Sequence, residues 1–187
     1  MFKYSTSTSP VNFNDFLVRH KSFDDIFCDL EKSINLQLIG KGREDKLMKI
    51  TSFKGEYYWL SNFYPCQIEY EGILYPSSEC AYVAAKTHDV LIKIKISKMT
   101  SADAKKFGKT MKLRDDWEKV KLKEMAKILK LKFNIPELRN KLLSTGNLYI
   151  EEGNWWGDTY WGVCNGTGKN YLGKLIMAIR KKINETT

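Results

Sequence analysis

Hydrophobic residues recur at helical spacing through the second half of the chain and predict three consecutive helices. The first is a long amphipathic helix over 115–132, with Asp115 and Glu118 at the spacing of an N-terminal cap. The second begins at 134–137 and ends at 145–146, where a glycine follows a threonine. The last covers 170–183, and its inward face is expected to carry Leu172, Leu175, Ile176 and Ile179.

The middle of the chain mixes β patterns with shorter helices. Strands are expected at 50–53, 57–60 and 148–150, and a hairpin at 68–75, where apolar and acidic residues alternate before a turn at Gly72. A helix opened by 76–78 should run to about 87, and another should span 98–109 with Thr100 or Ser101 as its cap. No internal repeat and no parallel-sheet alternation is present, so the pattern predicts an α+β, mainly helical domain with a small sheet or hairpin.

The first 46 residues form a separate region of the pattern. They start polar, then show a helical repeat of Phe23, Ile26, Phe27, Leu30 and Ile34 behind a cap at Ser22, and end in a charged linker at 40–45. A region this small cannot bury enough surface to be stable alone. We therefore expect residues 1–46 to be an N-terminal extension that packs on a single compact domain over 47–187.

Composition narrows the class of protein. Of the 187 residues 43% are hydrophobic, which argues against disorder, yet no apolar run approaches the roughly 20 residues that cross a membrane. The N-terminus lacks the apolar core of a signal peptide, so a cytoplasmic protein without membrane partners is expected. Four widely spaced cysteines and two histidines do not form a metal-ligand pattern, and neither a metal nor a cofactor is expected.

The net charge of +9 is concentrated in one stretch. Residues 93–132 hold fourteen Lys or Arg against five Asp or Glu, and the rest of the chain is balanced. Such a stretch is often only a solvated helical face. The functional alternative is the attraction of phosphate, either on a nucleotide or on a nucleic acid.

The segment 151–162 combines aromatic and acidic residues unusually densely. Trp155, Trp156 and Trp161 lie within seven positions, beside three carboxylates that include Asp158. Flat aromatic side chains can hold flat ligands such as nucleobases, and carboxylates can polarise water or stabilise a cation. This segment is therefore the first candidate for a site.

Two upstream segments could contribute to the same site. On the helix opened by 76–78, Glu79 and Lys86 are seven residues apart and lie on one face, with Tyr82 or Val83 between them. They could form one wall of a polar pocket or an ordinary surface stripe. In the loop 60–65, Ser61 and Asn62 are explained by turn chemistry alone unless the loop reaches the pocket.

Two further segments could bind anions. Gly166 to Asn170 open the last helix, whose N–H groups and dipole favour an anion, and Lys169 would add a charge. The spacing is not that of a P-loop, and a glycine turn with an asparagine cap is common for structural reasons. Arg114 could bind a phosphate in fork geometry or pair with Asp115 or Asp116.

Together these pieces resemble the NADAR family, also described as YbiA-like N-glycosidases. The resemblance covers roughly 50–182 and depends on the order and spacing of eight pieces: 53–55, 60–64, 75–79, 85–86, 114–117, 132–133, 153–162 and 168–180. It departs from the family pattern at Cys80, where the family often has histidine.

The resemblance implies a compact α+β fold and hydrolysis of an N-glycosidic bond between ribose and nitrogen. Implied substrates are phosphorylated ribosylamino intermediates of riboflavin synthesis, or compounds of the NAD and ADP-ribose type. By matching position, Glu79 and Asp158 are the expected catalytic acids. The expected substrate-binding residues are Ser61, Asn62, Phe63, Tyr82, Lys86, Arg114, Trp155, Trp156, Trp161, Lys169 and Asn170.

Two alternatives remain open at this point. The basic stretch 93–132 could make the protein a nucleic-acid-binding module, or the pocket could bind ADP-ribose without cleaving it. An enzyme that removes ADP-ribose from a nucleic-acid base would combine the basic stretch with a glycosidic pocket.

Overall fold

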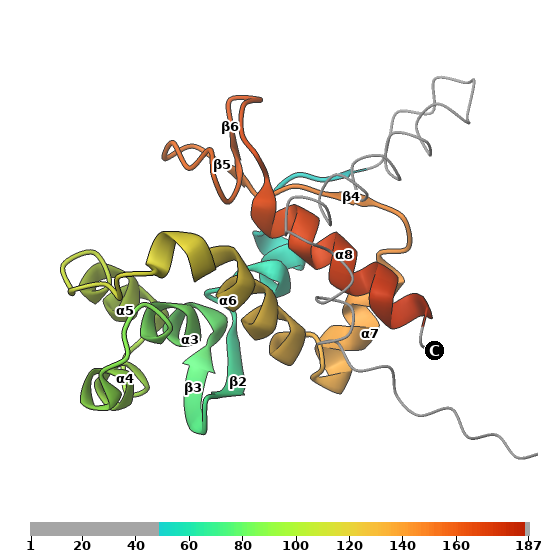
Figure 1. The fold of residues 1–187 in the computed structure, drawn as a ribbon. Helices are drawn as coiled ribbons and strands as arrows, with labels where there is room; N and C mark the ends of the chain where they lie inside the picture. Colours follow the sequence, from blue (N-terminus) through green and yellow to red (C-terminus); the bar gives the residue numbers. More distant parts are fainter. Residues whose placement is uncertain (1–48, 186–187) are drawn as a thin grey trace, which may run out of the picture. The chain divides into compact units, whose positions relative to one another are not determined.

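The computed structural model describes residues 49–185, and the predictions for residues 1–46 lie outside that range. The helices and strands follow one another as shown in Figure 1. Their bounds are β1 Lys49–Ile50, the 3-10 helix η1 Gly55–Leu60, β2 Pro65–Tyr70, β3 Ile73–Ser77, α3 Ser78–Ala84, α4 Val90–Ile96, α5 Ser101–Phe107, α6 Trp117–Lys132, α7 Pro136–Ser144, β4 Tyr149–Ile150, β5 Gly153–Asn154, β6 Val163–Cys164 and α8 Tyr171–Glu185. The predicted α+β, mainly helical class is confirmed.

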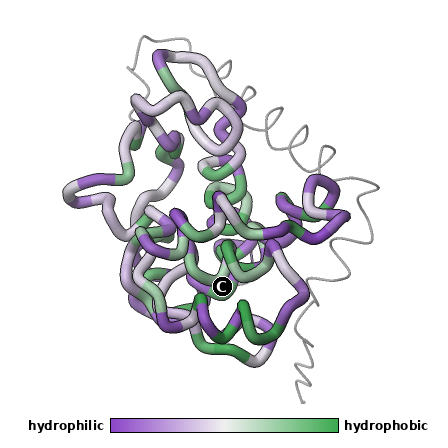
Figure 2. The backbone as a smooth tube through the Cα atoms, turned by 90° about the vertical axis from the view of Figure 1, so that its left-hand side faces the viewer, coloured by the Kyte–Doolittle hydropathy of each residue, from purple (hydrophilic) through white to green (hydrophobic). Residues whose placement is uncertain are grey.

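The long helices are amphipathic, and α6 lies at the centre of the packing. It contacts α3 and β2 on one side and α8 on the other, and α8 also packs on β4 and α7 (Figure 1). The predicted inward face of α8 is confirmed, because Leu172, Leu175, Ile176 and Ile179 are all buried. Hydrophobic and hydrophilic residues alternate along the helical parts of the chain, as Figure 2 shows.

The strands are short and pair in three separate places. The predicted hairpin is confirmed: β2 and β3 are antiparallel, with Ile68 opposite Tyr75 and a register shift between Pro65 and Ile68. The other two pairs, β1 with β4 and β5 with β6, are parallel and only two residues long. Parallel pairing was not expected from the sequence, since pairs this short leave no alternating pattern.

Three local predictions were wrong. Residues 57–60 form a 3-10 helix rather than a strand; Gly55 enters it with φ +54°, and its buried residues Trp59 and Leu60 are adjacent rather than alternating. Of the strand predicted at 50–53, only Ile50 pairs. Helix α6 begins behind Asp116, which makes no side-chain cap bond, so the proposed cap of Asp115 and Glu118 does not form.

None of the described helices is both long and apolar enough to span a lipid bilayer.

Candidate active site

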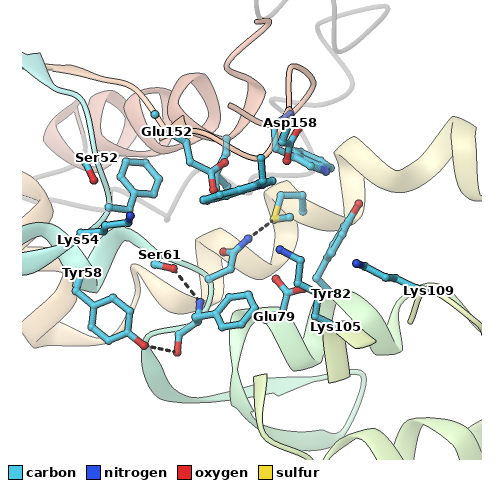
Figure 3. A pocket seen from close by; sticks show the side chains of 18 of the residues that line it. Ser52, Lys54, Tyr58, Ser61, Glu79, Tyr82, Lys105, Lys109, Glu152 and Asp158 are labelled. Atoms are coloured by element: carbon cyan, nitrogen blue, oxygen red, sulfur yellow. Dashed lines mark hydrogen bonds between the residues drawn. The ribbon is translucent and has the colours of Figure 1, made fainter. Parts of the chain in front are cut away.

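A cavity of about 540 Å³ lies between the 3-10 helix and its following loop, α3, α5 and the segment 152–161 (Figure 3). Its volume is within the range of small-molecule sites. Glu152 and Asp158 enter it from the C-terminal segment and Glu79 enters it from α3. The two carboxylates expected to be catalytic, Glu79 and Asp158, therefore share one cavity although they are 79 positions apart in the chain.

Most of the predicted substrate-binding residues line this cavity, but four do not. Those at the cavity are Ser61, Asn62, Phe63, Tyr82, Lys86, Trp156 and Trp161. The other four are Arg114, Trp155, Lys169 and Asn170, and each has a different surrounding. Several lining residues were not predicted: Ser52, Phe53, Lys54, Tyr58, Lys105, Lys109, Met125, Glu152, Gly153 and Leu172.

The four residues outside the cavity lining interact with protein groups or with solvent. Arg114 forms the two-pronged pair with Asp116 that was one of its alternatives, at 2.6 and 2.9 Å. The Lys169 ammonium lies over the rings of Tyr160 and Tyr171. Trp155 is 78% exposed and packs edge-on against Trp156.

Asn170 is buried and its amide is used to join β4 to α8. Its Oδ1 accepts the backbone N–H of Glu152 at 3.1 Å, and its Nδ2 donates to the carbonyl of Ile150 at 2.9 Å and to the Tyr149 hydroxyl at 3.2 Å. Asn170 has a φ of +51°, a conformation that asparagine tolerates better than most residues. It therefore positions the backbone of a cavity residue without lining the cavity itself.

Glu79 is fixed where the hairpin turns into α3. Ser77 caps the helix by accepting the N–H of Cys80, which places Glu79 in the first turn. The backbone N–H of Glu79 donates to the carbonyl of Asn62 at 2.9 Å, so the loop that carries Ser61, Asn62 and Phe63 is held against the helix start. A backbone hydrogen bond thereby joins two of the elements that line the cavity, this loop and α3.

Asp158 lies in a tight turn between β5 and β6. Its Oδ1 accepts the N–H groups of Tyr160 and Trp161 at 3.0 and 2.9 Å. Asn154 closes the turn from the other side, accepting the N–H of Asp158 and donating to its carbonyl. This arrangement fixes the carboxyl group and directs Trp161 toward the cavity.

Burial and neighbouring charges change the protonation of the cavity groups. Burial raises the pKa of Glu79, although the ammonium groups of Lys105 and Lys86 oppose this. Burial raises the pKa of Glu152 to about 8, and the Asp158 carboxylate acts in the same direction. Burial lowers the pKa of Lys86, which the Glu79 carboxylate counteracts. Three carboxyl groups thus share one cavity with several lysines, and burial raises the pKa of two of them, Glu79 and Glu152.

Aromatic rings form the apolar part of the wall. Tyr82 is buried and meets Trp161 edge-on at 5.6 Å between ring centroids, and on its other side it meets Trp117. The ammonium of Lys105 lies over Phe63 at 5.2 Å and over Trp156 at 5.7 Å. Flat rings beside cations suit a ligand that has a base at one end and negative charge at the other.

Lys132 binds the backbone at the end of the 3-10 helix, next to the loop that lines the cavity. Its side chain is fully buried, and its Nζ donates to the carbonyls of Leu60 and Ser61 at 3.2 and 2.6 Å. Burial lowers its pKa to about 7, with the nearby Cys66 opposing that shift. The charge is therefore costly in the folded state at neutral pH.

The pKa of Lys132 makes stability depend on pH in a defined direction. An unfolded lysine keeps its proton up to a pKa near 10.4, so between pH 7 and 10 the unfolded chain binds more protons and stability rises with pH. From pH 7 to 9, we expect the free energy of unfolding of the wild type to gain about 2 kcal/mol relative to Lys132→Met. Urea unfolding at both pH values measures this difference. Lys119→Met, an exposed change on the same helix, keeps Lys132, so the wild type should show no such gain relative to it; an equal gain of the wild type relative to both variants would contradict the assignment.

Among residues 49–185 there is no group of three or more His, Cys, Asp or Glu side chains that could hold a metal ion.

The family of this chain follows from its match to a known protein domain. A model of the NADAR domain matches residues 51–184, which include every element that contributes to the cavity. The chain belongs to the NADAR domain family.

The relatives of this chain are named either as N-glycosidases or as riboflavin biosynthesis proteins. The chain is 34% identical over 155 residues to N-glycosidase YbiA of Shigella boydii, an alignment that covers 80% of this chain and 96% of that protein. It is 35% identical over 134 residues to a riboflavin biosynthesis protein of Vibrio vulnificus, covering 68% of this chain but 36% of that longer protein. The solution NMR structure of Escherichia coli YbiA superposes with a TM-score of 0.67 at 32% identity, covering 80% of this chain and 92% of that one.

Proposed function

We propose that this protein is an N-glycosidase that hydrolyses the bond between C1′ of a phosphorylated ribose and a nitrogen of a base or amine. The observation that carries the proposal is the shared cavity of Glu79 and Asp158, walled by Tyr82 and Trp161. The similarity to proteins named N-glycosidase over 80% of the chain supports this activity.

The two carboxylates supply what hydrolysis at C1′ requires. As the C1′–N bond breaks, positive charge develops on the ribose ring, and a carboxylate close to that carbon stabilises it. A second carboxylate accepts a proton from the attacking water. Glu79 and Asp158 fill these two roles, and their entry from different walls fits a sugar held between them (Figure 3).

The lysines of the cavity are suited to the phosphate. Lys54, Lys105 and Lys109 line it together with Lys86. Two of them come from the basic stretch 93–132, whose charge is otherwise partly used inside the protein: Lys93 pairs with Glu71, and Lys132 binds backbone carbonyls. The basic stretch thus contributes to the cavity as well as to the surface.

Lys105→Gln is expected to raise KM about tenfold for a phosphorylated ribosyl substrate, because a charge-assisted hydrogen bond is lost. For the same substrate without phosphate the change should be small. Steady-state kinetics on the two substrates measures the difference, with the exposed Lys112→Gln as a control outside the cavity. Equal losses on both substrates would show that Lys105 does not bind phosphate.

Two substrate groups fit this cavity. One is a ribosylamino pyrimidine phosphate of the kind formed in riboflavin synthesis, as the names of some relatives suggest. The other is a compound of the NAD or ADP-ribose type. A cavity of about 540 Å³ accommodates a mononucleotide-sized ligand, which favours the first group.

Removal of ADP-ribose from a nucleic-acid base is the second candidate function. The observation that favours it is Trp155, which is 78% exposed and packs on the cavity residue Trp156. An exposed indole ring can stack a base that lies outside the cavity, as in proteins that bind single strands.

A substrate panel tests the proposal. The protein is incubated with a ribosylaminouracil phosphate, NAD, ADP-ribose and an ADP-ribosylated oligonucleotide, and the products are separated by mass spectrometry. Release of a free base or amine together with ribose phosphate is the expected result, and it should be lost in Asp158→Asn. Tight binding of a ligand without any product would instead indicate a sensor, and salt-dependent oligonucleotide binding that survives Asp158→Asn would indicate a binding module.

A further inference from the structure

Glu152 is a third carboxyl group in the cavity, and the two-carboxylate mechanism does not use it. It lines the cavity together with Glu79 and Asp158. Its Oε2 is sealed from solvent and has no hydrogen-bond partner among the described residues. Since Oε2 is enclosed, only Oε1 can meet a ligand in the cavity.

An unpartnered, buried carboxyl oxygen costs much less in the neutral acid than in the anion. We assign the carbonyl oxygen of the neutral acid to the enclosed Oε2, so that the proton lies on Oε1 and is available to a ligand in the cavity. The charged groups that act on Glu152 are Asp158 and Glu79, which favour the neutral acid, and Lys105, which opposes it. Burial is the largest influence, and the resulting pKa of about 8 keeps the group protonated at neutral pH.

The backbone holds this acid firmly. The N–H of Glu152 donates to Oδ1 of the buried Asn170, and its carbonyl accepts the N–H of Val163 at 2.8 Å. The next residue, Gly153, allows close approach to the first strand region, because a Cβ there would lie 2.1 Å from the carbonyl oxygen of Thr51. Because its backbone is fixed in this way, the Glu152 carboxyl group can be held against one particular atom of a bound ligand.

We propose that Glu152 is the general acid that protonates the leaving nitrogen when the N-glycosidic bond breaks, an inference that rests on the proposed N-glycosidase function. The C1′–N bond breaks with its electron pair going to nitrogen, and the proton on Oε1 is transferred to that nitrogen. Water forms the new bond to C1′ and gives a proton to the carboxylate of Glu79 or Asp158, which then passes it to solvent. Proton exchange with solvent then restores Glu152, so no other reactant is consumed.

The role of Glu152 specifies the class of leaving group. A neutral amine or base nitrogen leaves poorly without a proton, whereas a cationic pyridinium, as in NAD, leaves as a neutral base and needs none. The amide of Asn62 adds to this picture, since its Oδ1 is buried with no hydrogen-bond partner within 49–185 and the residue lines the same cavity. It can accept an N–H of the leaving group, so the site is suited to amino-substituted, neutral leaving groups.

The test is a pH profile of hydrolysis of ribosylaminouracil phosphate by wild type, Glu152→Gln and Glu151→Gln. Wild-type kcat is expected to fall above about pH 8, as the acid loses its proton. Glu152→Gln should lower kcat about 10²-fold at pH 7 and remove the alkaline fall. Glu151→Gln makes the same chemical change one residue away, where the side chain faces Lys49 and does not line the cavity, and should keep both rate and profile.

The other outcomes are distinguishable. An alkaline fall that persists in Glu152→Gln, for example from titration of Lys86, would overturn the assignment while leaving the N-glycosidase function intact. Should Glu152→Gln fail to fold by circular dichroism, Glu152→Asp replaces it: a reduced rate with the alkaline fall moved away from its wild-type pH supports the acid, and a fall that stays at the wild-type pH overturns it. Absence of wild-type hydrolysis on every substrate of the panel would overturn the proposed function and the inference with it.

Discussion

Glu79→Gln is expected to lower kcat by about 10²–10³-fold while leaving the protein folded. Glutamine keeps the shape of the side chain but removes the negative charge that stabilises the ribosyl cation or accepts the proton from water. The loss should be largest in kcat rather than in KM, because the charge on the sugar exists only near the transition state.

Single-turnover rates of base release measure this effect without interference from product release. Glu118→Gln is a matched control: Glu118 is exposed at the start of α6, where it pairs with Lys121, and it does not line the cavity. Near-normal turnover of Glu79→Gln would remove this residue from the mechanism and leave Asp158 and Glu152 as the acids to consider.

Gly173→Ala is expected to destabilise the protein by about 3 kcal/mol, the upper part of the usual range for overpacking. Gly173 lies in the first turn of α8, where the helix crosses β4. A Cβ there would lie 2.2 Å from the carbonyl oxygen of Ile150 and within 2.7 Å of the Asn170 amide. Neither group can move freely, because Asn170 also holds Ile150 and Glu152.

Urea unfolding measures the change, and Gly146→Ala provides the contrast. Gly146 has a φ of +54°, but a Cβ there meets no atom of the described part of the chain within 4 Å, so only about 1–2 kcal/mol of backbone strain is expected. If the two substitutions cost the same, close packing of α8 on β4 is not what limits the residue at position 173. Crowding at Gly173 should also lower activity through Asn170, whereas Gly146→Ala should leave activity intact.

The elements that the sequence predicted well are those with long periodic patterns. Helices α6, α7 and α8 each bury one stripe of apolar residues, and that stripe is visible without any knowledge of partners. Helix α4 received no prediction. Its sequence alternates isoleucine with lysine, and the buried Lys93 pairs with Glu71, 22 positions earlier, at 2.5 Å. A contact between residues so far apart has no local signal.

Only part of the cavity lining was predicted from the sequence, because contacts between distant residues leave no local signal. Glu79 and Asp158 were found through their motifs, but Glu152 could not be told apart from Glu151 by composition. Glu152 lines the cavity, whereas Glu151 lies 3.9 Å from Lys49 and does not line it. Lys105 belongs to the basic stretch 93–132, yet its place over Phe63 and Trp156 depends on how α5 packs.

The hydrogen bonds of Asn170 affect how tolerance to substitution is interpreted in this chain. One amide there ties the end of β4, the start of α8 and the backbone of Glu152. A saturation screen scored on catalytic output would rank position 170 beside the acids themselves, although that amide touches only protein. Positions near this cavity that do not tolerate substitution therefore include residues that hold the backbone as well as residues that act on the substrate. Separating the two classes requires a measurement of ligand affinity alongside growth or turnover.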